Sequence, residues 1–546
     1  MEQLLMLWNW LQEASDHRET RAADEGEISS AEQAMRLANE RVSEADYENA
    51  LKFAEEAIRL EPSNAECHVC KGQICESFDR YEEAAAAYSE AIKLEPDCIG
   101  FYFLQGEAYS FLEKYEEAAA AFSAAIRLDP SLAIAHASQG DAYANLEKHD
   151  EAIDSYSTAI RLAPHRADSY CKIGNIHIEL GMHEDAISIL SAAIKMDPSC
   201  SEAYMLLGNA YRSLKQHNEA FGAYSTAVAL NPSNAYYHCH EGMAYENLGR
   251  RDEAIAEYSA AIALEPFNHF YHFCLGKAYS GWKRHDEALA AFSTAIKLKP
   301  SSCDYYYCLG DTYENLEKYE EAIAAFSAAI GLKPSDGFYR YRLGDACKSL
   351  EKYDEAIAAF SAAIDLEPSC AHYHFSLGDA YEGLEKYDEA LAAFSAAIAL
   401  EPSNAVYRYR LGDACKSLEK YDEAIAAFSA AIDLEPSRAH YHFSLGDAYE
   451  NLKKYDEALA AFSAAIKLDP SNAYTYYYRG HIFDTRWVEN GESSDLQMAI
   501  ADFEKALVLD PSDTAARNRK KACEDTLVEM RGQYATLRTG GSSYGR

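Results

Sequence analysis

Apolar and small residues recur along most of the chain with a period of 34 residues. The repetition is strongest in residues 338–405 and 406–473, which are the same 68-residue text with six differences. Each copy consists of two 34-residue units, and each unit reads as two helices joined by a short polar turn. A period of this size is typical of an array in which each helix pair buries its apolar face against its neighbours.

The prolines define the register of the repeat. All 14 prolines fall at 34-residue steps from Pro62 to Pro470, followed by a step of 41 residues to Pro511. With proline at position 32, fourteen units occupy residues 31–513, and the last unit holds seven additional residues near 490–494, between its helices. Proline at this position ends the second helix and directs the chain into the next unit.

Small residues occupy the positions where the two helices of a unit should approach each other. Position 8 is glycine in thirteen units, and positions 20 and 27 are alanine in all fourteen. Position 24 is aromatic in twelve units, with Ala54 and Leu190 as the exceptions. We therefore predict that the helices approach to about 8 Å at the small residues and that the ring at position 24 fills the space between units.

This pattern resembles the tetratricopeptide repeat (TPR) family and covers 483 of the 546 residues. The resemblance implies an all-α fold, a right-handed α-solenoid of about 14 helix hairpins, and a role in binding proteins. The family often has a bulky residue such as tryptophan at position 4. Here that position holds His, Arg or Tyr in the later units, and tyrosine stands at position 3 from Tyr237 to Tyr441.

Two segments flank the array. Residues 1–30 predict a short amphipathic helix followed by an acidic linker. We favour a helix that caps the first unit, and the alternative is that Trp8 and Trp10 dock it onto a partner. Residues 514–546 carry a local charge of +4 and predict a basic capping helix with a disordered tail. Folding of this basic segment onto the acidic array is the alternative.

The net charge of −39 narrows the choice of partner. An acidic surface repels phosphate backbones and attracts cationic segments, so we expect Lys/Arg-rich protein segments rather than nucleic acid. The same charge would also simply keep a long array in solution. The 14 scattered cysteines fit a reducing compartment, cytoplasmic or nuclear. No apolar run approaches the roughly 18 residues needed to span a bilayer, so we expect no membrane association.

The sequence offers little catalytic or metal chemistry. A Gly-x-Ser-x-Gly pattern around Ser543 lacks the strand and helix that hold a nucleophilic serine. Cys67 and Cys70, with Cys75 nearby, are the best metal candidates, but zinc needs four ligands and no second such pair occurs. We expect no catalytic residue, no metal site and no cofactor, which leaves an enzyme or metal protein as a remote alternative.

The resemblance places positions 2, 5, 6, 9, 12 and 13 of the first helices on a concave, peptide-binding face. Along this face position 5 is aromatic in seven consecutive units, position 9 is aspartate in five, and position 6 alternates between arginine and serine from residue 342 to residue 444. The candidate binding residues are Phe273, Tyr307, Asp311, Tyr341, Arg342, Asp345, Phe375, Asp379, Tyr409, Arg410, Asp413, Phe443, Asp447 and Tyr477.

An aromatic ladder beside a carboxylate ladder suits an extended peptide that carries Arg or Lys. The alternative is that the rings only pack, and that Asp345 pairs on its own helix with Arg342 or Lys348. If the face binds a peptide, the duplicated text predicts two equivalent sites 68 residues apart.

Chaperone adaptors of this family clamp a carboxylate tail with Lys at position 5 and Asn at position 6. Position 5 of this chain is never Lys and position 6 is never Asn, so no chaperone tail is expected. The sequence therefore predicts a non-catalytic scaffold or adaptor. The alternative is a structural subunit of a larger assembly that contacts partners through its convex faces or its ends.

Overall fold

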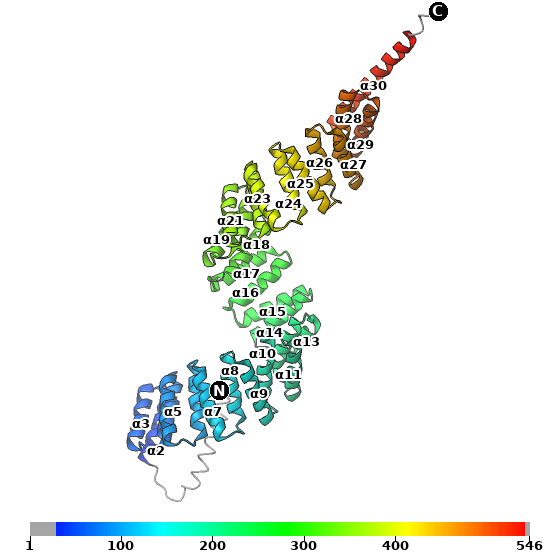
Figure 1. Cartoon of the computed structure of the whole chain (residues 1–546). Helices are drawn as coiled ribbons and strands as arrows, with labels where there is room; N and C mark the ends of the chain where they lie inside the picture. Colours follow the sequence, from blue (N-terminus) through cyan, green and yellow to red (C-terminus); the bar gives the residue numbers. More distant parts are fainter. Residues whose placement is uncertain (1–28, 541–546) are drawn as a thin grey trace, which may run out of the picture. The chain divides into compact units, whose positions relative to one another are not determined.

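The computed structural model describes residues 29–540, with side chains through residue 531. Within these residues the chain forms helices and the turns between them, without strands. The helices follow one another in hairpins (Figure 1). The amphipathic helix expected near the N-terminus and the last six residues of the tail lie outside the described residues.

Each hairpin coincides with one predicted unit. The first helices are α2 (Ser30–Ser43), α4 (Ala65–Ser77), α6 (Ile99–Phe111), α8 (Ala133–Asn145), α10 (Ala167–Glu179), α12 (Ser201–Ser213), α14 (Ala235–Asn247), α16 (His269–Gly281), α18 (Cys303–Asn315), α20 (Gly337–Ser349), α22 (Ala371–Gly383), α24 (Ala405–Ser417), α26 (Ala439–Asn451) and α28 (Ala473–Asn490). The second helices are α3 (Tyr47–Leu60), α5 (Tyr81–Leu94), α7 (Tyr115–Leu128), α9 (His149–Leu162), α11 (His183–Met196), α13 (His217–Leu230), α15 (Arg251–Leu264), α17 (His285–Leu298), α19 (Tyr319–Leu332), α21 (Tyr353–Leu366), α23 (Tyr387–Leu400), α25 (Tyr421–Leu434), α27 (Tyr455–Leu468) and α29 (Ser493–Leu509).

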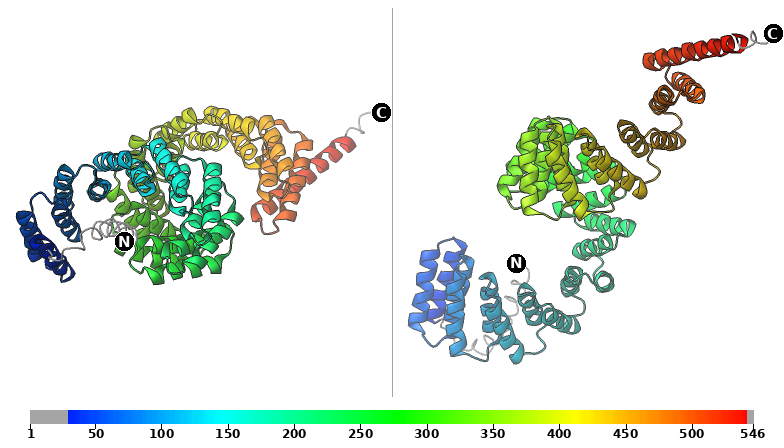
Figure 2. Two further views of the ribbon diagram at one scale, coloured as in Figure 1. Left: turned by 90° about the horizontal axis from the view of Figure 1, so that it is seen from below. Right: turned by 45° about the horizontal axis from the view of Figure 1, so that its top comes forward.

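The chain divides into two compact parts, Met1–Cys274 and Leu275–Arg546, and the boundary falls within α16. In both parts each hairpin packs against the next, so that a second helix contacts the first helix that follows it. Figure 2 shows the same succession of hairpins from two further directions. The array is thus all-α and built by nearest-neighbour packing, as the repeat predicts.

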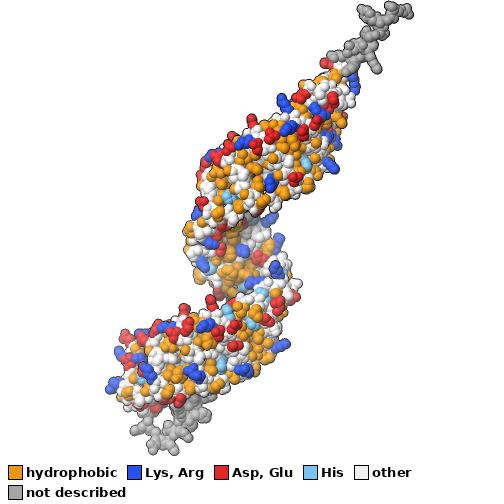
Figure 3. All heavy atoms as spheres, in the orientation of Figure 1, with side chains coloured by type: hydrophobic (Ala, Val, Ile, Leu, Met, Phe, Trp, Pro, Cys, Tyr) orange, Lys and Arg blue, Asp and Glu red, His pale blue; other side chains and the backbone are white. Residues whose placement is uncertain are grey.

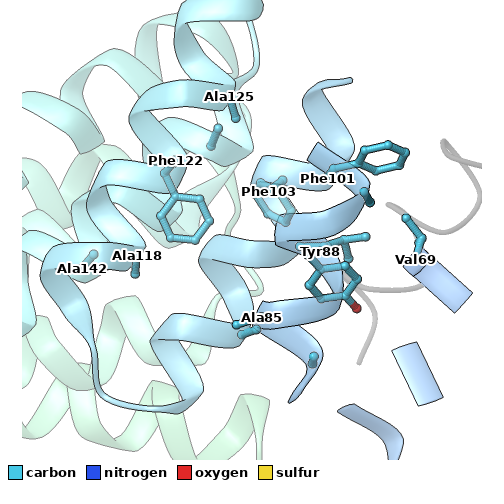
Figure 4. Close-up of a cluster of buried hydrophobic side chains, with 14 of the residues drawn as sticks. Val69, Ala85, Tyr88, Phe101, Phe103, Ala118, Phe122, Ala125 and Ala142 are labelled. Carbon is cyan, nitrogen blue, oxygen red and sulfur yellow. The ribbon is translucent and has the colours of Figure 1, made fainter. Parts of the chain in front are cut away.

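In twelve of the fourteen hairpins, the core holds a ring at position 24 that lies on a glycine at position 8. A Cβ added to Gly344 would meet Phe360 at 2.6 Å, and one added to Gly412 would meet Phe428 at the same distance. Both rings are fully buried. Figure 4 shows a buried cluster near the N-terminus, in which Phe122 lies among Phe103 and other hydrophobic side chains of neighbouring helices. The close packing predicted for the glycines is confirmed, whereas the ring, which was predicted to fill the space between units, lies against the glycine of its own unit.

The turn inside each hairpin has a feature that the sequence did not reveal. The residue at position 15 has a positive φ in all thirteen units from residue 31 to residue 472, and in eleven of them it is not glycine. Glu351, with φ of 58°, is typical. Its conformation lets the N–H of Lys352 reach the carbonyl of Cys347, at 3.0 Å, which closes the first helix.

The last unit and α30 (Thr514–Gly540) end the array. The seven additional residues form helix rather than loop, because α28 has 18 residues and α29 has 17, against 13 and 14 in the preceding hairpin. Ala516 and Cys523 of α30 are buried in a cluster with Leu496 and Phe503 of α29. No described helix is long and apolar enough to cross a membrane.

Candidate peptide-binding face

The aromatic side chains at position 5 stack on the first helix of the following unit. Tyr341 lies 5.3 Å from Tyr373 between ring centroids, with an angle of 17° between the ring planes. The corresponding pair Tyr409 and Tyr441 is separated by 4.9 Å. These rings are half-buried, and one face of each is covered by the ring at position 3 of the next unit. The aromatic ladder therefore stabilises the contact between hairpins.

Arg342 joins two units through the predicted face. Its guanidinium donates to the hydroxyl of Tyr307 at 2.8 Å and to Asp311 at 2.9 Å, and it is also paired with Glu314. It lies 5.4 Å from the centroid of the Tyr307 ring. Burial alone would lower its pKa, but the hydrogen bond and the charge of Glu314 raise the pKa of Arg342 above its ordinary value. Arg342 is therefore a charged side chain whose position is set by its contacts with the preceding unit.

Arg410 repeats the arrangement 68 residues later. It lies 2.9 Å from Asp379 Oδ1, is paired with Glu382, and lies 5.9 Å from the centroid of the Phe375 ring. Because Phe375 has no hydroxyl, Arg410 lacks the hydrogen bond that Tyr307 accepts from Arg342. The side chain of Arg410 is 30% exposed, against 16% for Arg342.

Lysines at position 12 connect further aspartates of the face. Lys348 lies 3.3 Å from Asp345 on its own helix and 3.8 Å from Asp379 of the next unit. Lys416 donates to Asp447 at 2.9 Å. The pairing of Asp345 with Lys348 is one that the sequence allowed, whereas Arg342 contacts the preceding unit instead of Asp345.

Asp413, the fourth aspartate of this row, is half-buried beside Tyr409. Burial raises the pKa of Asp413, against the opposing charge of Lys416. Burial, and after it the charge of Asp413, raises the pKa of Tyr409 to about 12. Both groups therefore hold their protons more readily than an exposed Asp or Tyr side chain does.

A third acidic pair, Asp447 and Glu450 on α26, follows the pairs that hold Arg342 and Arg410. Position 6 of the next unit is Tyr478 here, so no arginine reaches this pair from α28. The Tyr478 ring lies 5.4 Å from Phe443, where the earlier units place a guanidinium, and its hydroxyl lies 2.8 Å from that of Tyr474.

Glu450 is thereby left with weak partners. His481 Nε2 lies 3.6 Å from its Oε1, and its buried Oε2 has no hydrogen-bond partner. Burial, and after it the charge of Asp447, raises the pKa of Glu450 to about 7, although Arg519 opposes the shift. The negative charge of Asp447 is partly offset by Lys416, which contacts it.

Exposed side chains of the face stand at position 2, which the resemblance placed on this face although no candidate residue was named there. They lie beside the position 5 ring of the preceding unit, as His372 does at 5.2 Å from Tyr341 between ring centroids. The signal available in the sequence was an aromatic, aliphatic or histidine side chain at this position in five consecutive units. These residues are Phe338, His372, Val406, His440 and Tyr474.

The remaining predicted residues lie at the two ends of this row. Phe443 contacts Phe462 at 5.4 Å between centroids, and Tyr477 contacts Phe503 at 5.8 Å. Phe273 is half-buried on α16 and belongs to the N-terminal part of the chain. The structure thus brings together Tyr307, Asp311 and Arg342 in one cluster, whereas Tyr477 packs against Phe503 of α29.

The cysteines that the sequence offered as metal ligands do not converge. Cys67, Cys70 and Cys75 are buried in three different clusters of the core. Burial raises the pKa of the Cys70 thiol to about 12, which opposes the thiolate that a metal would need. These residues are core side chains.

Comparison with known proteins identifies the class of repeat. The tetratricopeptide repeat family model matches residues 35–97, 103–167, 171–235, 239–302, 341–405, 375–416 and 409–473. These segments cover well over half of the chain, so the chain belongs to the tetratricopeptide repeat family. A second family model, for anaphase-promoting complex, cyclosome, subunit 3, matches residues 281–363.

Three solved structures illustrate the similarity. The hetero-tetramer Cut9-Hcn1 of the APC/C is 16% identical, and the match covers 91% of this chain and 96% of that one with a TM-score of 0.40. MamA is 28% identical over 32% of this chain and 94% of its own, with a TM-score of 0.30. YrrB, described as a TPR protein with an unusual peptide-binding site, is 24% identical over 33% and 94%, with a TM-score of 0.30. No curated protein sequence matches the chain. The family assignment rests on the repeat model.

Proposed function

We propose that this chain is a non-catalytic adaptor that binds extended, Lys/Arg-rich protein segments along the first helices of its C-terminal part. The binding face consists of positions 2, 5, 6, 9 and 12 of α18, α20, α22, α24, α26 and α28. Its half-buried carboxylates supply the attraction for cations, and the exposed side chains at position 2 supply apolar contacts.

The acidic pair Asp447 and Glu450 is the observation that carries this proposal. The two equivalent pairs each bind an arginine of the chain itself, Arg342 and Arg410, against an aromatic ring. The third pair has the same acids and Phe443 but no arginine. A basic side chain of a partner would supply the missing charge, and several such contacts along the row would add together.

Charge on the surface supports the same proposal less specifically. Figure 3 shows acidic side chains over both parts of the chain, interspersed with basic ones. With a net charge of −39, the chain favours encounter with cationic segments over nucleic acid. This long-range attraction weakens with salt, so the affinity for a basic peptide should fall as ionic strength rises.

The proposal is tested by the affinity of the full chain for an Arg-rich peptide, measured by fluorescence anisotropy. The double variant Asp447→Asn/Glu450→Gln should weaken binding at least about tenfold, which corresponds to about 1.4 kcal/mol. A peptide with glutamate in place of arginine should not bind.

The control removes the same number of charges elsewhere. Asp365 and Asp433 are exposed on second helices, so Asp365→Asn/Asp433→Asn leaves the first-helix face unchanged. This control should retain affinity within about twofold of the unaltered chain. An equal loss of peptide affinity in both variants would mean that net charge alone determines binding, and it would refute a site at Asp447 and Glu450.

A second candidate is a structural subunit of a larger assembly, which the match of residues 281–363 to the anaphase-promoting complex subunit 3 model favours. In that case partners would bind through second-helix faces or the ends of the array. Cross-linking followed by mass spectrometry on native complexes distinguishes the two. Cross-links concentrated on second helices support the subunit, and cross-links to α20–α28 first helices support the adaptor.

A further inference from the structure

Two acids replace an apolar pair in the hairpin of α14 and α15. Position 7 is leucine in each of the six units that follow, and position 23 is alanine in the same six. In this hairpin the two positions hold Glu241 and Glu257. Glu241 is only 5% exposed. An acid this deeply buried needs a charge partner or a proton.

His238, one turn before Glu241 on α14, completes a three-residue cluster. One ligand atom from each of His238, Glu241 and Glu257 lies within 4.8 Å of the others. His238 Nδ1 lies 2.6 Å from Glu257 Oε2, and Nε2 lies 3.0 Å from the carbonyl oxygen of Pro232. The His238 and Glu257 side chains are 13% and 24% exposed, so the cluster is reachable from solvent.

Other hairpins show which side chains suit positions 7 and 23. In the last unit these positions hold Arg479 and Asp502, whose charges match and which form two hydrogen bonds of 2.8 and 2.7 Å. In the unit of residues 133–166 they hold Gln139 and Ser155, which form a hydrogen bond of 3.3 Å. Both pairs are electrically balanced.

The pair Glu241 and Glu257 is not balanced. Two ionised carboxylates face at most one positive charge on His238, and burial makes this excess negative charge unfavourable. Burial, and after it the charge of Glu257, raises the pKa of Glu241. Burial lowers the pKa of His238, but the hydrogen bonds to Glu257 and to the Pro232 carbonyl outweigh it and raise that pKa. A divalent cation would neutralise both carboxylates.

We propose that His238, Glu241 and Glu257 bind a divalent transition-metal ion, with His238 coordinating through Nδ1. One imidazole nitrogen and carboxylate oxygens are donors that suit Mn²⁺ or Zn²⁺. The carbonyl of Pro232 accepts a hydrogen bond from Nε2–H, which fixes the tautomer that leaves the Nδ1 lone pair for the metal. The site is independent of the proposed peptide-binding face and departs from the expectation of no metal site drawn from the sequence.

Binding would require the three side chains to rearrange around the ion. The ion takes the place of the proton between Nδ1 and Glu257, and that proton is released to solvent. Donors bound to one ion at about 2.1 Å lie about 3 Å apart, so His238 and Glu257 must separate by a few tenths of an ångström. The Glu241 oxygen, which lies within 4.8 Å of the other two donor atoms, must move closer to them. Water completes the coordination, because three protein ligands leave an open position.

The test is titration of the full-length, chelator-treated chain with Mn²⁺, followed by the loss of the electron paramagnetic resonance signal of free Mn²⁺. Mn²⁺ is chosen because thiolates prefer softer metals, so the 14 cysteines do not compete. We expect saturation at about one Mn²⁺ per chain, and at least a tenfold loss of affinity in Glu241→Leu and in Glu257→Ala. Each variant installs the residue that six other hairpins carry, and circular dichroism confirms that it is folded.

The matched control is His272→Asn in the next hairpin. His272 Nε2 lies 3.0 Å from the carbonyl oxygen of Pro266, the same contact that His238 makes, but positions 7 and 23 of that unit are leucine and alanine. This variant should bind Mn²⁺ as the unaltered chain does. Absence of saturable Mn²⁺ binding, or equal binding by the unaltered chain and the folded Glu241→Leu variant, would overturn the proposal.

Discussion

Positions 8 and 24 vary together, because each glycine makes room for one large side chain. The first unit has Ala38 where the others have glycine, and it is also the unit with Ala54 in place of the ring. Glycine is also needed opposite a leucine, because a Cβ on Gly174 would lie 2.6 Å from Leu190. The sequence predicted a close approach of helices here, but the pairing of these two positions required the structure.

Gly344→Ala should destabilise the protein, because its Cβ would lie 2.6 Å from the Phe360 ring. Overpacking of this kind costs about 1–3 kcal/mol. Gly331→Ala is the control, because nothing lies within 4 Å of its added Cβ and alanine favours helix by about 1 kcal/mol over glycine. Chemical denaturation should therefore show shifts of opposite sign, and two shifts of the same sign would contradict this packing.

The raised pKa of Glu450 predicts a pH dependence of stability. Its folded pKa of about 7 exceeds the roughly 4.3 of an unfolded glutamate. The folded state therefore binds the extra proton in this range, and the contribution to stability is lost as the pH rises from about 4.3 through about 7. The free energy of unfolding at pH 5 and pH 8 should differ less in Glu450→Gln than in the unaltered chain. The exposed-site variant Asp365→Asn should keep the original difference.

At the scale of the helix, several side chains contact residues of the neighbouring hairpin where the sequence suggested partners on the same helix. Spacing of three residues on α20 suggested that Asp345 pairs with Arg342 or Lys348. Lys348 does pair with it, but the partners of Arg342 are Asp311 and Glu314 of α18. The stacking of position 5 on position 3 of the next unit is likewise a contact between hairpins. Such contacts depend on the rotation between hairpins, which a local pattern does not define.

Arg342→Ala should destabilise the protein more than Arg410→Ala. Arg342 is less exposed and donates an additional hydrogen bond to Tyr307. Loss of one partner from a largely buried pair costs about 3 kcal/mol, and the extra hydrogen bond adds about 1 kcal/mol. Urea denaturation of the two variants gives the comparison directly, because their repeats are nearly identical. Equal destabilisation would mean that the Tyr307 hydroxyl and the lower exposure contribute nothing.

Turns and the last hairpin were the least predictable elements. The ends of the second helices could be predicted from the 34-residue register of the prolines, because proline is not tolerated inside a helix. The left-handed conformation at position 15 could not be predicted, because glycine occupies this position only at Gly181 and Gly249. In the other units, residues such as Glu351 adopt the same conformation. The inserted residues looked like a loop around Gly491, but they extend both helices, and Gly491 supplies the left-handed end of α28.

At the scale of the whole chain, stability comes from contacts between successive hairpins, so each end exposes an apolar face. At the C-terminus α30 covers that face. Ala516 and Cys523 are buried against α29, and Arg519 lies 2.9 Å from Asp484 of α28. Part of the local positive charge therefore contacts the acidic side chains of the last hairpin.

Removal of α30 should uncover Leu496 and Phe503, which are fully buried in the complete chain. A chain ending at residue 513 should unfold at a lower urea concentration and bind a hydrophobic dye more strongly. Size-exclusion chromatography of the same sample should show self-association. A truncated chain that stays monomeric and equally stable would contradict the role of α30 as a cap.

The contacts of the proposed peptide-binding face were only partly predictable from the sequence. The pattern gave the positions of the acidic and aromatic rows, but it treated every member of a row as equally available. The structure separates Asp311 and Asp379, which are paired with arginines of the chain, from the Asp447 and Glu450 pair, which has none. Arg342 and Arg410 therefore occupy the first two acidic pairs, and the pair that lacks an internal arginine lies near the C-terminal end of the duplicated segment.

The most direct test of the adaptor proposal is the affinity of Tyr478→Arg for the Arg-rich peptide. This variant supplies in the chain itself the arginine that position 6 carries in the two equivalent units. We predict at least about tenfold weaker binding together with higher stability to urea. Val488→Arg adds the same charge on the same helix, at an exposed site outside the proposed face, and should lower the affinity much less. If Tyr478→Arg binds the peptide as tightly as the unaltered chain, the acidic pair on α26 is not the binding site.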